Sequence, residues 1–214
     1  MANRGRLFVI SGPAGAGKTE IVKKLIEKHP DVKLSVSCTT RAPRPGEVNG
    51  VNYHFVSDER FTQLVNEGAF YEWAHVHQNR YGTLKSTVQD ELAEGHDLIL
   101  EIDVQGCLQA MAQDDTVTGI FVCPPSRENL ERRLRGRGTE TEESIRVRLN
   151  NVAGEVATAY KYHYVIIHQD WSDVPNALEI AADEAYAIIS ARRLEIANRR
   201  DFLDHLSASL LNQE

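Results

Sequence analysis

The chain has 214 residues, of which 42% are hydrophobic; this is enough to bury the core of one α/β domain and excludes disorder over most of the length. Its formal net charge of -7 at pH 7 argues against a protein that coats nucleic acid or an anionic membrane, because such binding depends on clustered cations. We therefore expect neither nucleic acid nor membrane as a partner, and a polyanionic ligand must be held by a local concentration of lysine and arginine.

Short apolar runs alternate with amphipathic ones along the chain, as in a parallel sheet flanked by helices. The strands are predicted at Arg6–Ser11, Leu34–Ser37, Leu98–Ile102, Gly119–Val122 and Tyr164–Ile167. The helices are predicted at Lys18–Lys28, Gln105–Met111, Ser126–Leu134 and Glu142–Ala157, with a long helix from Val174. The predicted fold class is α/β: a P-loop parallel sheet core flanked by helices, with an inserted mixed antiparallel lobe and a mobile lid.

The first strand leads into a glycine-rich phosphate-binding loop, which in turn leads into a helix. The loop consists of Gly12, Pro13, Ala14, Gly15, Ala16, Gly17, Lys18 and Thr19. Glycines let successive N–H groups face one anion, Lys18 reaches the terminal phosphates, and the Thr19 hydroxyl can ligate Mg²⁺. An ordinary glycine-rich turn is the alternative, but the flanking strand and helix favour a site for a nucleoside triphosphate.

The pattern changes between Ser37 and Glu94, where a Pro/Gly-rich turn is followed by two apolar segments, Val51–Phe55 and Phe70–His77. We interpret these segments as antiparallel strands of an inserted lobe that faces the phosphate-binding loop. Such a lobe is the expected place for a second substrate.

Two arginines in this lobe, Arg41 and Arg44, lie on a stretch stiffened by proline, and Tyr53 and Tyr81 follow downstream. Guanidinium forks and phenol hydroxyls together form a receptor for a phosphate dianion. Solvated surface arginines in a turn are the alternative.

Carboxylates occur where the strand near residue 100 ends. Glu101 and Asp103 lie on one face of this strand, and its carboxyl end overlooks the ligand crevice of a parallel sheet. Asp103 would there hold a Mg²⁺-bound water or orient an arginine, and capping of the next helix is the alternative.

A basic helix end follows at Arg133 and Arg137, which are one helical turn apart. Glycines then loosen the backbone before a helix that Thr141 would cap. We expect a lid here that closes over the triphosphate and excludes water. An exposed basic helix end beside an acidic one is the alternative.

Apolar residues recur with a helical period from Val174 onward, beside arginine pairs at 192–193 and 199–200. Packing on the same molecule is one explanation for this long helix. A homodimer contact through the C-terminal helix is the other.

The three cysteines, Cys38, Cys107 and Cys123, include no C-x-x-C pair, which favours a reducing compartment over a disulfide framework. No apolar stretch reaches the length of a membrane span. We therefore expect a cytoplasmic protein.

Six motifs in the same order resemble those of the guanylate kinase family, over about Leu7 to Asp170. They are Ser-Gly-Pro-x-Gly-x-Gly-Lys at 11–18, Thr-Thr-Arg-x-Pro-Arg-x-Gly-Glu at 39–47, Glu-Trp-Ala at 72–74, Tyr-Gly at 81–82, Ile-Asp-Val-Gln-Gly at 102–106 and Gly-Arg-Gly-Thr-Glu at 136–140. The resemblance implies Mg²⁺-dependent phosphorylation of GMP, and also of dGMP, by ATP. It also implies a P-loop core at 1–36 and 95–214, a lid at about 133–148 and a GMP-binding lobe at 37–94.

The resemblance also implies residue roles. In the GMP site, the phosphate is held by Arg41, Arg44, Tyr53 and Tyr81, and the guanine is read by Ser37, Glu72 and Thr83. Asp103 belongs to both the GMP site and the catalytic set, and His168 lies near the adenine. The other residues implied to act in catalysis are Lys18, Arg41, Arg133, Arg137 and Arg148. The chemistry agrees, because the donor edge of guanine requires a carboxylate and its O6 requires a hydroxyl. Phosphoryl transfer between two nucleotides needs positioned cations and no covalent nucleophile.

Three positions depart from the family pattern: Ala14 replaces serine, Glu20 replaces a hydroxyl residue and His168 replaces asparagine. Two alternative functions stay open. One is a catalytically inactive module of this kind that binds phosphoproteins, against which Lys18 and Thr19 argue. The other is a P-loop kinase for a different phosphorylated acceptor, against which Glu72 argues.

Overall fold

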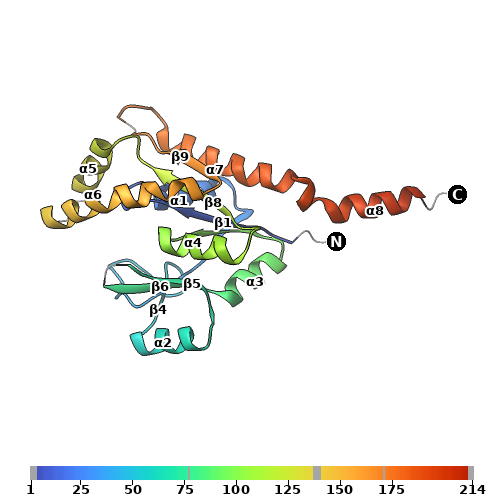
Figure 1. The fold of residues 1–214 in the computed structure, drawn as a ribbon, viewed down its shortest axis with the longest axis horizontal. Helices are drawn as coiled ribbons and strands as arrows, with labels where there is room; N and C mark the ends of the chain where they lie inside the picture. Colours follow the sequence, from blue (N-terminus) through green and yellow to red (C-terminus); the bar gives the residue numbers. More distant parts are fainter. Residues whose placement is uncertain (1–3, 77, 137–140, 171, 212–214) are drawn as a thin grey trace.

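The computed structural model of the chain describes residues 4–76, 78–136, 141–170 and 172–211. Its core is a five-stranded parallel sheet in the order β2-β7-β1-β8-β9 (Figure 1). The strands are β1 (Leu7–Ser11), β2 (Val32–Leu34), β7 (Asp97–Glu101), β8 (Thr118–Cys123) and β9 (Tyr164–Ile167). The central strand β1 is buried along its whole length, which explains why its sequence is an unbroken apolar run.

Helices cover both faces of this sheet, and the alternation of side chains along β1 separates the two layers. Phe8 and Ile10 belong to the cluster that contains α1 (Lys18–Lys28) and α7 (Ala177–Leu194). Leu7 and Val9 belong to the cluster that contains α3 (Lys85–Ala93) and α4 (Val104–Gln113).

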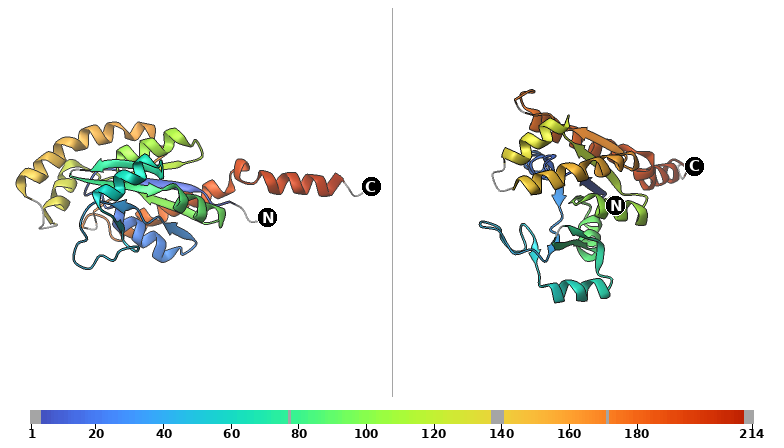
Figure 2. Two further views of the ribbon diagram at one scale, coloured as in Figure 1. Left: turned by 90° about the horizontal axis from the view of Figure 1, so that it is seen from below. Right: turned by 60° about the vertical axis from the view of Figure 1, so that its left-hand side comes forward.

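A second, four-stranded sheet has the order β4-β3-β6-β5 and lies to one side of the core, with its own small apolar cluster (Figures 1 and 2). Its elements are β3 (Cys38–Thr39), β4 (His54–Phe55), α2 (Asp58–Asn66), β5 (Phe70–Val76) and β6 (Asn79–Leu84). The predicted antiparallel pairing is confirmed for β5 with β6, but it is wrong for β4, which pairs with β3 in parallel.

Two helices form an αα unit over the phosphate-binding loop. They are α5 (Arg127–Gly136) and α6 (Glu142–Ala157), followed by a short 3-10 turn, η1 (Ala159–Lys161). Leu130 and Leu134 of α5 pack against Ile145 and Leu149 of α6. The predicted cap is confirmed, because the Thr141 side chain accepts a hydrogen bond from the Ser144 N–H.

The sequence predicts one long helix from Val174, and this prediction is wrong, because the C-terminal segment is divided into two helices. Helix α7 ends at Leu194, a 3-10 turn η2 (Ile196–Asn198) follows, and α8 (Arg200–Leu211) then projects away from the rest of the molecule (Figures 1 and 2). Packing on the same molecule is confirmed for α7, whose alanines contact the core. It is wrong for α8, in which no residue is buried.

The other predicted elements agree with the structure to within two residues at each end, except the strands at Leu34–Ser37 and Val51–Phe55, the second of which starts only at His54. The observed strand β2 ends at Leu34, and the chain then leaves the core sheet for the second one. The helices α2 and α3 were not predicted. Among the residues described, we find no helix with the length and apolarity needed to cross a bilayer.

Candidate active site

The loop between β1 and α1 has the backbone of an anion cradle. Gly12, Gly15 and Gly17 have φ values of 138°, 90° and 93°, a region that residues with a Cβ rarely adopt. Helix α1 begins directly after Gly17, which makes no side-chain capping bond. The Lys18 ammonium folds over the loop and donates to the carbonyls of Gly12 at 2.7 Å and Pro13 at 3.1 Å. The N-terminal end of α1 and one cation therefore converge where the sequence predicts the triphosphate.

Thr19, the predicted Mg²⁺ ligand, contacts a carboxylate from the neighbouring strand. Its hydroxyl donates to Glu101 Oε1 at 2.5 Å, and Glu101 is the last residue of β7. Burial raises the pKa of Glu101, and the Thr19 hydrogen bond partly offsets that effect. Sequence reasoning placed Glu101 beside Asp103 but gave it no role. The missing information was that residue 19 lies over the end of β7.

Asp103 caps α4, as the alternative interpretation held, because its side chain accepts a hydrogen bond from the Gly106 N–H at 2.8 Å. It also lines the cleft described below. Burial raises the pKa of its carboxyl, and the bond to Gly106 counteracts this. The capping bond fixes the side chain at the mouth of the cleft.

The three residues predicted to read guanine lie together at the second sheet, two of them on its strands and Ser37 directly before β3. Glu72 on β5 is paired with Thr83 on β6, and the hydroxyls of Ser37 and Thr83 are 3.2 Å apart. Glu72 is only 4% exposed, and its Oε1 makes no hydrogen bond. Burial raises its pKa to about 7. A buried carboxylate oxygen with no partner is costly, so this pocket is suited to a ligand that supplies donors.

Arg41 is oriented by a carboxylate that sequence reasoning left without a role, Glu47. The Arg41 Nη2 and Nη1 atoms lie 2.8 Å from Glu47 Oε1 and 3.0 Å from Glu47 Oε2, a bidentate pair. Glu47 Oε2 also accepts from the Arg44 backbone N–H at 2.7 Å. The Arg41 guanidinium lies 5.5 Å from the centre of the Tyr53 ring, and that ring meets Tyr81 edge-on at 5.9 Å. Arg41, Tyr53 and Tyr81, which are predicted to bind a phosphate, thus lie together beside one ion pair.

Arg133 and His168 hold the other side of the loop. Arg133 donates to Asp170 Oδ1 at 2.6 Å and to the Ala16 carbonyl at 3.1 Å. His168 Nδ1 lies 2.9 Å from the same carbonyl. A Cβ added at Gly17 would lie only 2.3 Å from His168 Nδ1. Burial lowers the pKa of His168. The carbonyl can only accept, whereas Arg133 Nη1, which lies 3.4 Å from the same Nδ1, can only donate. The shorter contact, with the carbonyl, favours the tautomer that has its proton on Nδ1 and leaves Nε2 as an acceptor.

One cleft of about 450 Å³ brings most of the predicted residues together. It is lined from four parts of the chain: Gly12, Ala14 and Lys18; Ser37, Arg41, Arg44, Tyr53, Glu72 and Tyr81; Glu101 and Asp103; and Arg148, Asn151 and Glu155. Arg148 enters from α6 and contacts Ser144 at 3.5 Å. Arg137 lies outside the described residues. Lys18 and Arg41, which are 23 positions apart in the sequence, thus face the same space.

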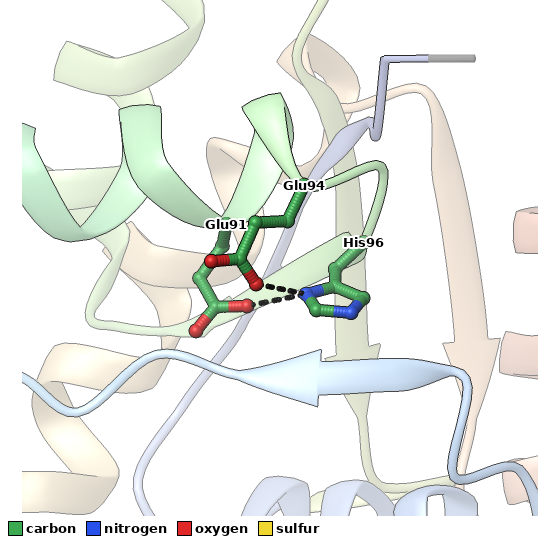
Figure 3. Close-up of side chains that lie close together, drawn as sticks. All are labelled: Glu91, Glu94 and His96. Atoms are coloured by element: carbon green, nitrogen blue, oxygen red, sulfur yellow. Dashed lines mark hydrogen bonds and ion pairs between the residues drawn. The ribbon is translucent and has the colours of Figure 1, made fainter. Parts of the chain in front are cut away.

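A separate cluster of potential metal ligands lies at the opposite end of the core sheet. Within the described ranges, Glu91, Glu94 and His96 form the one group whose ligand atoms all lie within 4.8 Å of one another. His96 Nδ1 is 2.7 Å from Glu91 and 3.5 Å from Glu94 (Figure 3). His96 precedes the amino end of β7, whereas Glu101 ends it. This cluster is therefore not part of the cleft.

A phosphate-binding loop at the carboxyl end of a parallel sheet, facing arginines and a buried carboxylate across one cleft, defines the class of P-loop nucleotide kinases. The family model described as guanylate kinase matches residues 4–185. The chain belongs to the guanylate kinase family, whose members are enzymes that phosphorylate GMP with ATP.

Individual relatives agree with this assignment. A guanylate kinase of Syntrophotalea carbinolica is 48% identical over 179 residues, which cover 84% of each protein. One from Shewanella sp. (strain MR-7) is 41% identical over 213 residues, which cover 97% of this chain and all of that protein. The crystal structure of guanylate kinase from Anaplasma phagocytophilum has a TM-score of 0.73 at 32% identity, and the match covers 90% of this chain and 88% of the other. None of these comparisons supports the inactive module or a different acceptor.

Proposed function

We propose that the protein transfers the terminal phosphoryl group of ATP, bound with Mg²⁺ at the phosphate-binding loop, to GMP or dGMP bound in the second sheet. The observation that supports this most directly is the shared cleft. The cation of the loop, Lys18, and the cations of the lobe, Arg41 and Arg44, line the same space as the buried Glu72. Two polyanions can be brought together only where such cations offset their repulsion.

In this proposal the guanine base binds between β5, β6 and the segment before β3. Glu72 accepts hydrogen bonds from N1–H and the N2 amino group, while the hydroxyls of Ser37 and Thr83 donate hydrogen bonds to O6. The unpaired Glu72 Oε1 supports this assignment, because guanine supplies the missing donors. Adenine has no donor at N1 and would leave the carboxylate unpaired, which explains rejection of AMP.

The GMP phosphate is assigned to Arg41 and Arg44, with the hydroxyls of Tyr53 and Tyr81. The planar forks match two phosphate oxygens each, and the tyrosines line the same wall of the cleft. Asp103 faces the bound nucleotide from the end of the core sheet, where its capping bond holds it in place.

ATP is assigned to the loop residues Gly12 to Thr19, with His168 near the adenine. A neutral His168 that offers Nε2 as an acceptor is complementary to the exocyclic amino group of adenine. Lys18 leaves the loop carbonyls for the terminal phosphates. Arg133 and Arg148 supply further positive charge from α5 and α6, as does Arg137.

Mg²⁺ is assigned to Thr19 and the carboxylate beside it. A hydroxyl 2.5 Å from Glu101 Oε1, at the carboxyl end of a parallel strand, is the oxygen donor set that Mg²⁺ prefers. When bound there, Mg²⁺ neutralises charge on the triphosphate. Glu101 also lines the cleft.

The molecule then divides into a core at 1–36 and 95–214, a GMP-binding lobe at 37–94 and a lid at 133–148. We place it in the cytoplasm, in agreement with cysteines that are all free.

A coupled assay with AMP, CMP, UMP, GMP and dGMP as acceptors tests the proposal. We expect turnover with GMP and dGMP, a requirement for Mg²⁺, and rates at least ~10⁴-fold lower in kcat/KM with AMP. Equal turnover of AMP and GMP would refute the assigned role of Glu72.

A further inference from the structure

Helix α4 contains a glycine, Gly106, at a position where the backbone does not require one. Gly106 is buried in the first turn of the helix, and it is not among the glycines that adopt a positive φ. Glycine inside a helix is less favourable than alanine, because it loses more backbone freedom on folding. The absence of a side chain at this position therefore needs an explanation in the packing around it.

The explanation is the carboxylate of Glu72, which occupies the space that a side chain at position 106 would need. A Cβ added at Gly106 would lie 2.4 Å from Glu72 Oε2 and 3.3 Å from Glu72 Cδ. The first of these distances is far below the roughly 3.5 Å at which non-bonded heavy atoms attract one another. Asp103 Oδ1 would be 3.3 Å away, a tight contact that requires only a small shift. A side chain at position 106 and the Glu72 carboxylate therefore exclude each other.

Helix α4 is packed on two sides, so it cannot move away from an added methyl group. The helix lies between the core sheet and the second sheet (Figure 1). Cys107 and Ala110 are fully buried in the apolar cluster of the core. Gln109, one turn after Gly106, accepts a hydrogen bond from the Trp73 N–H of β5 at 3.4 Å. The end of the Glu72 side chain is the flexible member of the contact, and it is the group that a larger residue would displace.

We propose that Gly106 is a positioning residue for the recognition of guanine. Because it has no side chain, the Glu72 carboxylate lies with Oε2 against α4, and the buried Oε1, which has no hydrogen-bond partner, is left for the base. This inference rests on the guanine site proposed above. Glu72 belongs to the second sheet and Gly106 to a helix of the core, so the group that reads the base is positioned where these two parts of the molecule meet.

The test is Gly106→Ala, with Gly154→Ala as the matched control. Gly154 also lies inside a helix, α6, but a Cβ added there would meet no atom within 4 Å. Moving a charged acceptor out of hydrogen-bond range should lower kcat/KM for GMP at least ~10-fold in Gly106→Ala. The KM for ATP should stay within about twofold of wild type, and Gly154→Ala should change neither quantity by more than about twofold.

A double-mutant cycle with Glu72→Ala tests whether the effect passes through the carboxylate. In the Glu72→Ala background no carboxylate is left to displace, so adding Gly106→Ala should change kcat/KM for GMP by less than about twofold. If Gly106→Ala alone does not fold, the double variant should fold, because the clash is gone.

Several results would overturn the proposal. One is an unchanged kcat/KM for GMP in Gly106→Ala, and another is an equal rise in the KM for ATP, which would indicate a general structural role. The same loss in the Glu72→Ala background, or a double variant that stays unfolded, would assign the effect to Asp103 or to the helix itself. If Glu72→Ala leaves kcat/KM for GMP unchanged, the proposed guanine site is wrong and this inference fails with it. If Glu72→Ala lowers kcat/KM and Gly106→Ala does not, only the role of Gly106 is wrong.

Discussion

Replacing Glu72 with glutamine tests how the protein recognises guanine, because the change keeps the size of the side chain and converts one oxygen into an NH₂ group. Glu72 is 4% exposed, and Oε1 has no hydrogen-bond partner. In the proposed complex both carboxylate oxygens accept from guanine. Glutamine offers one acceptor, and its NH₂ group would face a guanine donor.

The expected loss follows from these contacts. One hydrogen bond to a charged acceptor is removed, and one buried donor is left facing another donor, which together cost about 2–4 kcal/mol. GMP should therefore bind Glu72→Gln roughly 30- to 1,000-fold more weakly. Isothermal titration calorimetry measures this, with the exposed Glu59→Gln in the same lobe as the control. Binding of GMP by Glu72→Gln within about twofold of wild type would refute the assignment.

The pH dependence of binding provides a second readout. Burial raises the pKa of Glu72 to about 7, so this carboxyl is half protonated near neutral pH in the free protein. GMP needs the ionised form. The affinity of wild type relative to Glu72→Gln should therefore increase from pH 6 to pH 8, by about tenfold per unit below the pKa. Taking the ratio cancels the titration of the GMP phosphate itself, whose second pKa is near 6.

The same carboxyl should lower the stability of the free protein at high pH. Its pKa of about 7 in the folded state is above the ordinary value of 4.5, so the folded state binds more protons between those values. The free energy of unfolding then decreases as the pH rises through this window, by about 3 kcal/mol in total. Glu72→Gln should lack this decrease, and urea unfolding at pH 5 and pH 8 would show it. An equal pH dependence in both proteins would mean that burial does not perturb this group.

Three further substitutions address the triphosphate side of the cleft. Lys18→Met should lower kcat at least ~10³-fold and leave GMP affinity within about threefold of wild type in calorimetry; an equal loss of GMP binding would mean that the two subsites are not separate. Thr19→Val removes the hydroxyl at constant shape and should raise the Mg²⁺ concentration for half-maximal rate about tenfold, in a titration at fixed ATP; an unchanged requirement would exclude Thr19 as a ligand. Gly17→Ala places a Cβ 2.3 Å from His168 Nδ1 at a φ of 93°, and should lower the free energy of unfolding by about 2 kcal/mol and weaken ATP binding. An unchanged Tm would contradict the described loop.

The core was predictable because its signals are local. Helix α1 and helix α6 have the predicted bounds, since an apolar period sets their inward faces and Thr141 caps the second. Helix α2 also had a readable start, Ser57 before two acidic residues, with Phe61 and Leu64 one turn apart. It was not predicted, because only the segments on either side of it, Val51–Phe55 and Phe70–His77, were interpreted as elements of the lobe. Helix α3 offers only Val88 and Leu92 and no side-chain cap, so its signal is weak.

The parts of the site that were missed depend on contacts between distant segments. Glu101 was identified at the carboxyl end of a strand, but nothing in the spacing indicates that Thr19, 82 positions earlier, donates a hydrogen bond to it. Glu47 is the last residue of the motif at 39–47, but its bidentate pairing with Arg41 depends on how the turn folds. The resemblance to the guanylate kinase family implied that Ser37, Glu72 and Thr83 read guanine, in agreement with the chemistry of that base, and the structure brings them together.

The ion pair between Arg41 and Glu47 makes anion binding at this point a competition. Any oxyanion that binds both terminal nitrogens of Arg41 must displace the Glu47 carboxylate, which is held at 2.8 Å and 3.0 Å. Its binding free energy is therefore only the difference between its own pairing with Arg41 and the pairing of Glu47 with Arg41. A singly charged ion such as chloride or nitrate gains little from that exchange, while a dianion with several oxygens gains more. The resting protein thereby keeps Arg41, the proposed phosphate ligand, paired with Glu47 in the presence of abundant small anions.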